Sequence, residues 1–231
     1  MSYIPANRLS SNYINSLPVI KFTGEVIIID SLEQEIEAIK LLRKEKKVGF
    51  DTESKPAFKK GVSYPISLVQ IATNDKAYLF QVKKTGFSDA LSDFLSSQDI
   101  KKIGVGVKND IAKLNELKDF EPGGFIDLST IAAEKGIIQI GIRGLTARYT
   151  SHRLVKSSQK TNWAKTDLTK KQQLYAASDA WICLQIYPLL LNDRTDYRQF
   201  ADDENSDMVG ELGIKEERRI KNHRAVGDRS R

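Results

Sequence analysis

Two acidic residues separated by one position follow an apolar stretch in the first quarter of the chain. They are Asp51 and Glu53, directly after Val48-Gly-Phe50. Side chains alternate between the two faces of a strand, so both carboxylates are expected on the same face. Open α/β sheets bind ligands beyond the carboxyl ends of their strands, and these residues occupy such an end. An ordinary solvated strand end would also carry such a pair, because Asp-x-Glu alone is common.

Three further polar residues have spacings that fit the same kind of site. Asp110 follows an apolar run that ends at Val107 and stands at the start of the next helical pattern. An acid at that position also has a purely structural explanation, because the helix dipole favours negative charge at the start of a helix. Tyr175 and Asp179 are four residues apart in a long helical pattern, which places both side chains on one face of the helix. Each feature is weak evidence by itself.

The combination of these acids is more specific than any one of them. Four carboxylates come from three separate elements, those of Asp51, Glu53, Asp110 and Asp179. They could not all stay ionised in one cleft without counter-charge. Hard divalent cations supply that charge, and Mg²⁺ binds few carboxylates while leaving positions for water and phosphate. The sequence therefore predicts a divalent-cation site.

The elements that must position these acids alternate between strand and helix patterns. Capping boxes, in which the side chain of a Ser or Thr and that of a later Gln satisfy backbone N–H groups, open two of the helices. We expect strands over 25–29, 48–53, 66–73, 77–82, 102–107 and 125–126. We expect a first helix opened by Ser31 and Gln34, with apolar residues at Leu32, Ile36, Ile39 and Leu42. Three further helices are expected: one over 88–97, one capped by Asn109 and one over 127–135. A long last helix is opened by Thr169 and Gln172 and bounded near its end by Pro188. This order implies an α/β fold with a mixed sheet.

The ends of the chain differ in composition from its middle. Residues 1–24 are rich in Ser, Asn and Pro and lack periodicity, which predicts an extended N-terminal arm. Residues 25–195 contain the strand and helix patterns and are expected to form one domain. Residues 196–231 hold an acidic block followed by a basic one with few apolar residues, which predicts a charged, flexible tail of the kind that termini often form.

The overall composition excludes several classes of protein. The chain has 231 residues, of which 40% are hydrophobic and 29% are charged, as in soluble globular proteins. Its uninterrupted aliphatic runs are too short to cross a bilayer, and no secretory signal is visible at its start. The single cysteine, Cys183, cannot form an internal disulfide, and no Cys/His spacing suits zinc. We expect an intracellular, reducing, cytoplasmic setting without a membrane partner.

The positive charge is concentrated in one stretch of the sequence. The net charge is +6, yet residues 143–171 hold eight basic residues and a single acid, Asp167. Such clustering is a footprint of nucleic-acid contact, although a solvated surface would also produce it. Trp163 lies inside this stretch and could pack against a base or anchor its loop in the core. The candidate nucleic-acid contacts are Arg153, Lys156, Lys160, Trp163 and Lys165.

The motifs together resemble those of the DEDD 3′–5′ exonucleases, in the subgroup (DEDDy) that carries a tyrosine in its third motif. The sister subgroup places a histidine where this chain has Leu174. The resemblance covers about residues 25–190, and between Asp51 and Val82 it is closer to the Werner-type exonuclease domain than to ribonuclease D. The matching segments are Phe50-Asp-Thr-Glu53, Asn109-Asp110 with Leu114, Tyr175-x-x-x-Asp179, Ile66-Ser-Leu-Val-Gln-Ile-Ala72, Phe125-Ile-Asp127, and Asn162-Trp163 before Leu168-Thr169.

The resemblance implies a ribonuclease H-like fold and hydrolysis assisted by two divalent cations, Mg²⁺ or Mn²⁺. It implies that Asp51 bridges both ions, that Glu53 and Asp179 complete the first site, and that Asp110 holds the second. Tyr175 would orient the attacking water, because a tyrosine with a pKa of about 10 is a poor base at neutral pH.

The implied activity is release of nucleoside 5′-monophosphates from a free 3′ end, with DNA favoured over RNA. The alternatives are an RNA 3′-end trimming enzyme similar to ribonuclease D, a proofreading subunit of an unseen polymerase, and a non-catalytic nucleic-acid-binding module. Nothing in the sequence predicts a protein partner.

Overall fold

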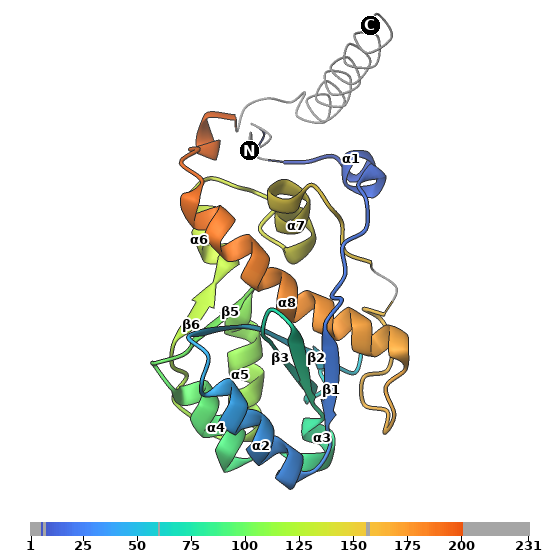
Figure 1. Ribbon diagram of the computed structural model, residues 1–231. Coiled ribbons are helices and arrows are strands. Elements are labelled where there is room, and N and C mark those ends of the chain that lie inside the picture. Colours follow the sequence, from blue (N-terminus) through green and yellow to red (C-terminus); the bar gives the residue numbers. More distant parts are fainter. Residues whose placement is uncertain (1–5, 7, 60, 156–157, 201–231) are drawn as a thin grey trace, which may run out of the picture.

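A six-stranded mixed sheet forms the centre of the protein. The computed structural model describes residues 6, 8–59, 61–155 and 158–200. The strands follow the order β1-β4-β3-β2-β5-β6 across the sheet, which lies in the lower half of the domain in Figure 1. β3 is antiparallel to both of its neighbours, whereas the remaining pairs are parallel. The strands are β1 (Glu25–Ile29), β2 (Lys47–Ser54), β3 (Ile66–Ala72), β4 (Lys76–Phe80), β5 (Lys101–Gly104) and β6 (Phe125–Asp127). The predicted α/β class and mixed sheet are confirmed.

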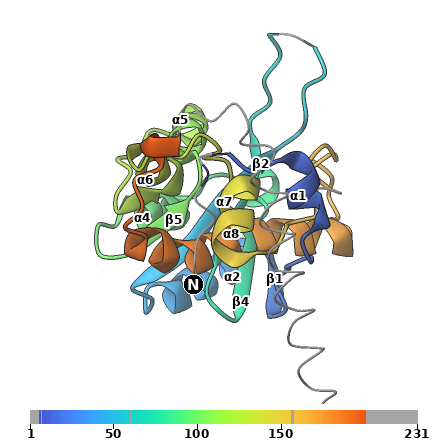
Figure 2. The same ribbon diagram turned by 90° about the horizontal axis from the view of Figure 1, so that it is seen from above.

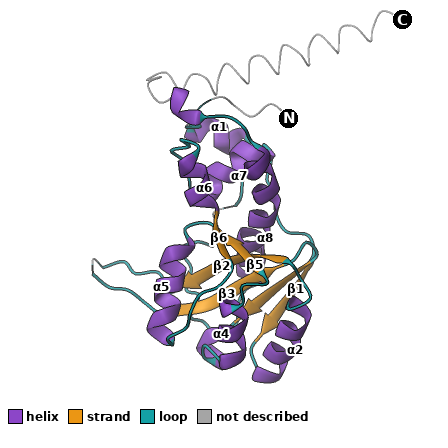
Figure 3. Ribbon diagram, turned by 90° about the vertical axis from the view of Figure 1, so that its left-hand side faces the viewer, coloured by secondary structure: helices purple, strands orange, loops and turns teal. Residues whose placement is uncertain are grey.

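Helices cover both faces of this sheet (Figure 3). α2 (Leu32–Leu42), α4 (Asp89–Ser96) and α5 (Val107–Leu117) pack on one face. α8 (Lys170–Asn192) crosses the other face, and α6 (Leu128–Glu134) and α7 (Ile142–Thr150) pack beside its second half. The short elements are α1 (Ser11–Ser16), α3 (Val82–Thr85) and the 3₁₀ helix η1 (Tyr197–Phe200).

Small residues bring α8 close to the sheet. A Cβ atom at Gly49 of β2 would lie 2.0 Å from the Ala180 carbonyl oxygen, so only glycine fits there. Ala176, Ala177 and Ala180 line the helix where it meets the sheet. The predicted Thr169/Gln172 capping box is present, but the helix continues past Pro188. This close approach is what allows side chains of β2 and α8 to meet.

α8 is the one described helix that is long and apolar enough to cross a membrane by length and composition, with a mean hydropathy of 1.3. Of its most apolar window, 56% is buried inside the protein. The core helix of a soluble protein passes the same test, so this feature is weak evidence for a membrane span.

Two predicted helix details are wrong for identifiable reasons. Asn109 does not cap α5: Gly106 precedes the helix in a left-handed conformation with φ of 73°, and Asn109 lies inside the first turn. On α2, Leu32 and Ile36 are 51% and 56% exposed, whereas Glu35 is buried. The Glu35 carboxylate accepts a hydrogen bond from the hydroxyl of Ser88, the N-cap of α4, where the helix dipole favours negative charge.

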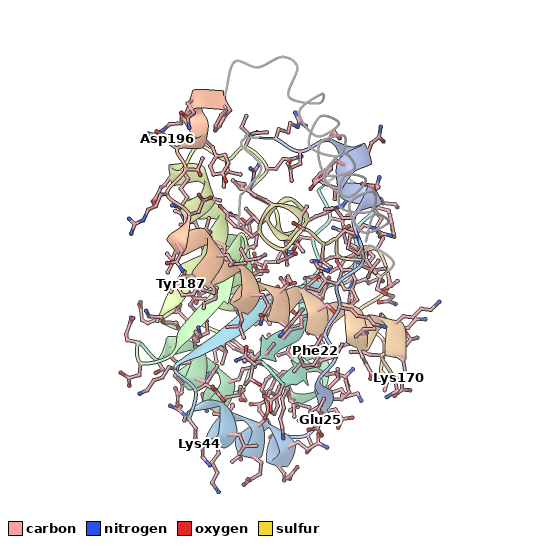
Figure 4. All side chains as sticks on the ribbon, turned by 45° about the horizontal axis from the view of Figure 1, so that its top comes forward. Phe22, Glu25, Lys44, Lys170, Tyr187 and Asp196 are labelled. Atoms are coloured by element: carbon pink, nitrogen blue, oxygen red, sulfur yellow. The ribbon has the colours of Figure 1, made fainter. Side chains whose placement is uncertain are left out.

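The described part of the N-terminal segment packs against the domain, whereas the sequence predicts an extended arm. Ser10 caps α1, and Leu9 and Ile14 pack with Ala147 of α7. Further on, the Phe22 ring lies 5.9 Å from the ring of Trp181 on α8 (Figure 4 labels Phe22). Leu9, Ile14 and Phe22 are spaced too irregularly to show a helix or strand period, and they are nevertheless buried against the domain. Most of the predicted charged tail, from residue 201, lies outside the described residues.

A lysine in β5 is fully buried. Lys102 is 0% exposed, and its Nζ donates a hydrogen bond to the Ser97 carbonyl oxygen at 2.5 Å. Nζ also lies over the rings of Phe94 and Phe125, at 6.0 and 5.3 Å from their centroids. Burial lowers the pKa of Lys102 to about 8. At pH values between about 8 and the ordinary pKa of 10.5, the lysine is protonated in the unfolded chain but not in the folded one. The free energy of unfolding therefore rises with pH over this range.

Replacing Lys102 with methionine is therefore expected to stabilise the fold. The variant Lys102→Met keeps the side-chain length and removes the charge that burial disfavours. We expect the melting temperature at pH 7 to rise by about 2–4 °C. The gain should shrink as the pH is raised from 8 to 10, because the wild-type lysine loses its proton over that range. Thermal unfolding at several pH values measures this, and parallel profiles for the two proteins would contradict it.

Candidate active site

Two of the predicted acids lie on the face of β2 that α8 covers. Asp51 and Glu53 follow Gly49 at intervals of two residues, and Gly49 faces Ala180 of α8. Strand alternation therefore directs both carboxylates toward α8. The antiparallel neighbour β3 places Gln70 opposite Asp51. The strand pairing becomes irregular immediately after Glu53, which is where a bulge re-aims the chain.

α8 supplies the third acid of the cluster. Asp179 is 5% exposed, and its carboxylate meets those of Asp51 and Glu53. One oxygen from each of the three acids lies within 4.8 Å of the other two. Asp179 is at least 126 positions from the other two acids in the chain, yet the three form one compact group of oxygen ligands.

Asp110 stands beside this group and is held by a different contact. It lies in the first turn of α5. The hydroxyl of Thr52 donates a hydrogen bond to Asp110 Oδ1, so the residue between the two acids of β2 fixes the acid of α5. Among the described residues, the group within 4.8 Å contains the other three acids and not Asp110. The role of Thr52 was missed by the sequence analysis, although its place inside the Asp-x-Glu motif was the available signal.

Burial and mutual repulsion disfavour the ionised form of the three carboxylates in the absence of a cation. Burial, followed by the charges of Asp179 and Asp110, raises the pKa of Asp51 well above its ordinary value. Burial raises the pKa of Glu53 to about 10, with Asp51 as the next cause. Burial also raises the pKa of Asp179 to about 7, although a hydrogen bond from Tyr175 opposes the rise. Among the described residues, no Lys or Arg contributes to these three shifts.

The Tyr175 hydroxyl remains protonated in this environment. Burial, followed by the charges of Asp179 and Glu53, raises the pKa of Tyr175. The group can therefore donate a hydrogen bond but does not act as a base at neutral pH. Its ring lies 5.9 Å from the ring of Trp163, which fixes the position of the phenol.

Two cavities reach Tyr175 and Asp179. The first, of about 470 Å³, lies between α1, the α6–α7 loop and the start of α7. The second, of about 430 Å³, lies between residues 19–21 and the start of α8. Both also touch Leu154 and Val155. A ligand could therefore reach the acidic group from either side of this segment.

The predicted nucleic-acid contacts that the structure describes differ in exposure and in role. Trp163 is 1% exposed and packs with Leu68 and Leu79, so it anchors its loop in the core and offers no ring to a base, which corrects its assignment as a contact. Arg153 Nε donates to the Leu17 carbonyl oxygen at 3.0 Å and ties down the N-terminal segment. Lys160 and Lys165 are exposed, and Lys156 lies outside the described residues.

Basic residues of the same stretch also take part in packing. Arg148, on α7, is 3% exposed and lies 4.5 Å from the centroid of the Tyr197 ring. The helix α7 itself was not predicted, because its basic residues obscured the apolar period. Local charge counting therefore overstated the basic surface.

Comparison with known proteins identifies the family. Residues 26–194 match the family model described as 3′-5′ exonuclease. The chain therefore belongs to the 3′–5′ exonuclease family, a family of nucleases that hydrolyse nucleic acids, and the DEDD resemblance is confirmed. The enzyme class predicted from the motifs is confirmed with it.

Several relatives agree with this assignment. The chain is 34% identical over 151 residues to the bifunctional 3′-5′ exonuclease/ATP-dependent helicase WRN of Mus musculus, covering 63% of this chain and 11% of that protein. It is 28% identical over 204 residues to a 3′-5′ exonuclease of Arabidopsis thaliana, covering 79% and 69%. The aligned part is thus a small fraction of the mouse protein.

Solved structures show the same fold. The EXO domain of Aedes aegypti Nibbler matches with a TM-score of 0.65 and 22% identity, over 83% of this chain and 95% of that one. Ribonuclease D of Escherichia coli matches with a TM-score of 0.65 and 20% identity, over 87% and 51%. The ribonuclease H-like exonuclease fold is therefore confirmed.

Proposed function

We propose that this protein removes nucleotides from the 3′ end of a nucleic acid by cation-dependent hydrolysis, releasing nucleoside 5′-monophosphates. The observation that carries the proposal is the convergence of Asp51, Glu53 and Asp179, with their oxygens within 4.8 Å of one another. Family membership supports the direction of cleavage.

We propose that these acids hold two divalent cations, Mg²⁺ or Mn²⁺. Asp51, Glu53 and Asp179 offer hard oxygen ligands in a half-buried group, and among the described residues no basic side chain contributes to their pKa shifts. We assign the first ion to these three acids and the second to Asp51 with Asp110. When bound, such ions stabilise charge on the phosphate and lower the pKa of a coordinated water.

The remaining residues position the reactants. The protonated Tyr175 hydroxyl is assigned to hold the attacking water by a hydrogen bond, since its raised pKa prevents it from accepting the proton as a base. Thr52 holds the Asp110 carboxylate in one orientation through its hydrogen bond. The cavities beside Tyr175 and Asp179 are the places where the terminal nucleotide would lie.

DNA is our first choice of substrate, and RNA is the alternative. The segment from Asp51 to Val82 resembles the Werner-type exonuclease domain, and identity is 34% to the mouse relative against 28% to a ribonuclease D of Sphingobium indicum. RNA is favoured by the ribonuclease D relatives and by the fold match to Trypanosoma brucei ribonuclease D, solved in complex with RNA U12.

The test uses 5′-labelled DNA and RNA strands of one sequence, each alone and as the recessed strand of a duplex. With Mg²⁺ we expect a ladder that shortens from the 3′ end and stops when a chelator is added. Faster digestion of RNA would select the alternative substrate. Internal fragments without a ladder, or digestion that survives chelation, would contradict the proposed activity.

The variant Tyr175→Phe tests whether the hydroxyl positions the attacking water or instead contributes to binding of the strand or the cation. We expect kcat to fall by about 10²-fold, because a misplaced nucleophile reacts more slowly. The KM for the strand and the affinity for Mn²⁺ should stay within about a factor of 2, since the ring and its contact with Trp163 are retained. Steady-state kinetics and calorimetry measure these values. A large loss of Mn²⁺ affinity with normal kcat would show that the hydroxyl serves the cation site instead.

A further inference from the structure

The connection between β2 and β3 projects from the domain. The loop begins directly after β2, two positions beyond Glu53, and its described residues, 55–59 and 61–65, extend away from the body of the protein in Figures 2 and 3. The loop carries lysines and aromatic residues together. Phe58 is 82% exposed, the highest value among the exposed large hydrophobic residues, and Lys55 and Lys59 are also exposed.

This loop faces the α7–α8 loop across a groove. A cavity of about 390 Å³ lies between them, and its lining contains Phe58, Lys59, Tyr64, Lys160 and Asn162. A neighbouring cavity of about 380 Å³ shares Lys55 and Tyr64 and adds Lys83. We call these two cavities the lysine groove. No acidic residue lines either of them among the described residues.

The chemistry of the lysine groove suits an unpaired nucleic-acid strand. Lysine side chains neutralise phosphates, and exposed aromatic rings stack on bases that are free of a partner strand. Both kinds of side chain alternate here: Lys55 Nζ lies 4.8 Å from the centroid of the Tyr64 ring. The exposed face of Phe58 would be covered by such a base, whereas a duplex keeps its bases stacked on one another.

Each of the two walls of the lysine groove leads along the chain to a residue of the acidic site or of its surroundings. One wall starts two residues after Glu53, about 7 Å further along the chain. The other wall contains Asn162, next to Trp163, whose ring packs against Tyr175. A strand whose 3′ end lies at Asp51 and Asp179 can thus continue into the groove.

We propose that the lysine groove holds the single-stranded segment that leads to the 3′ end, and that this enzyme therefore prefers single strands or 3′ overhangs to blunt duplex ends. The proposal rests on the proposed exonuclease function and adds the form of the substrate to it. It keeps Lys160 from the predicted contacts and adds Lys55, Phe58, Lys59 and Tyr64 of the loop between β2 and β3.

The test compares a 12-nucleotide single strand with a minimal substrate, the p-nitrophenyl ester of thymidine 5′-monophosphate, which cannot reach the groove. For the double variant Phe58→Ala/Lys59→Ala we expect kcat/KM for the strand, relative to that for the ester, to fall about 10-fold. The salt dependence of the strand reaction should also become shallower, by about 0.7 in the log–log slope for the lost lysine. The wild-type preference for single strands over blunt duplex should decrease.

The matched control removes two lysines elsewhere. Lys44 and Lys46 are exposed after α2, on the far side of the sheet from α8 (Figure 4 labels Lys44), and Lys44→Ala/Lys46→Ala should leave the ratio within about a factor of 2. An unchanged ratio in the groove variant, with normal ester turnover, would overturn the groove and leave the exonuclease function standing. Absence of turnover on both substrates in the wild type would instead refute the exonuclease function itself.

A second, independent observation concerns Gln70 on β3. Its side chain is 0% exposed, and neither atom of its amide has a hydrogen-bond partner among the described residues. It pairs in register with Asp51 on one side and with Leu79 on the other. Its neighbours on the same face of β3 are Leu68 and Ala72, which pack against alanines of α8.

An amide in this place conflicts with the stability of the fold. A buried polar group without a partner is costly, and an apolar side chain of the same size would avoid that cost. Directly paired residues on one face of a sheet have Cβ atoms about 4.5–5.5 Å apart, which brings the Gln70 amide within reach of the Asp51 carboxylate. Departures from local stability rules are expected at functional sites.

We infer that Gln70 is a positioning residue: its Nε2, which has no partner in the part of the chain that the structure describes, would donate a hydrogen bond to the Asp51 carboxylate when that group is ionised and would orient it toward the cation. This inference rests on the proposed cation site. It predicts opposite effects of one substitution on stability and on binding, which a purely structural role would not produce.

The test is Gln70→Met, which keeps the size of the side chain and removes its hydrogen bonds. In chelator we expect the melting temperature to rise by about 2–4 °C, while calorimetry shows Mn²⁺ affinity about 10-fold weaker than in the wild type. Leu79→Met, on the other side of Gln70, is the control for repacking and should leave the affinity unchanged. Unaltered Mn²⁺ affinity in Gln70→Met, or a lower melting temperature, would overturn the inference.

Discussion

Asp51→Asn is expected to lower turnover by about 10³–10⁵-fold, the range found when a central catalytic group is removed, while stabilising the cation-free protein. Asp51 belongs to the three-acid group, and its charge contributes to the raised pKa of Glu53. The amide of asparagine has nearly the same shape but cannot supply a second anionic oxygen to a cation. Turnover is therefore lost without loss of the fold.

The stabilisation follows from the sign of the pKa shift. Burial and neighbouring acids raise the pKa of Asp51 in the folded chain, so folding without cations must either take up a proton or bury a charge. This penalty begins above the ordinary pKa of 3.8 and grows as the pH rises. The melting temperature of Asp51→Asn in chelator should exceed that of the wild type, by more at pH 8 than at pH 5. Equal turnover, or a lower melting temperature across this range, would contradict the account.

Cation binding is expected to release protons and to become tighter with increasing pH. Ligand carboxyls must be ionised, yet the pKa of Glu53 is about 10 and that of Asp179 is about 7 in the cation-free site. At pH 7 these groups are partly or wholly protonated before a cation enters. The apparent affinity for Mn²⁺ should therefore rise about tenfold per pH unit for each proton released.

Calorimetry in two buffers of different ionisation enthalpy measures this release. We expect at least about one proton per bound Mn²⁺ at pH 7. Asp179→Asn is the matched comparison and should bind Mn²⁺ more weakly with fewer protons released, since one titrating ligand is gone. Heats that do not depend on the buffer would show that the acids are already ionised, which would contradict the electrostatic description of the site.

Sequence alone could predict the features that depend only on residues close together in the chain. The Thr169/Gln172 capping box and the four-residue spacing of Tyr175 and Asp179 depend only on the helix to which they belong. The alternation that directs Asp51 and Glu53 to one face depends only on their strand. These features were therefore predictable, and the structure joins them because Gly49 and the alanines of α8 permit close contact.

Features decided by tertiary contacts could not be predicted in the same way. For Trp163 the sequence left a base contact and a core anchor both open, and the packing of its ring against Leu68 and Tyr175 selects the anchor. Glu35 lies outside the apolar set predicted for its helix, yet it is buried where α2 meets α4, and its carboxylate accepts a hydrogen bond from Ser88. The lysine groove escaped notice because its two walls are about 100 residues apart in the chain, so no local charge window contains both.

Anomalous diffraction from a crystal soaked in Mn²⁺ tests the central claim most directly. A convergent acidic group that binds catalytic cations should give a manganese peak within coordination distance of carboxylate oxygens from Asp51, Glu53 and Asp179 together. The same soak of Asp51→Asn should lose or weaken that peak. A wild-type map without manganese at these three residues, obtained from a crystal of active protein, would contradict the proposed mechanism.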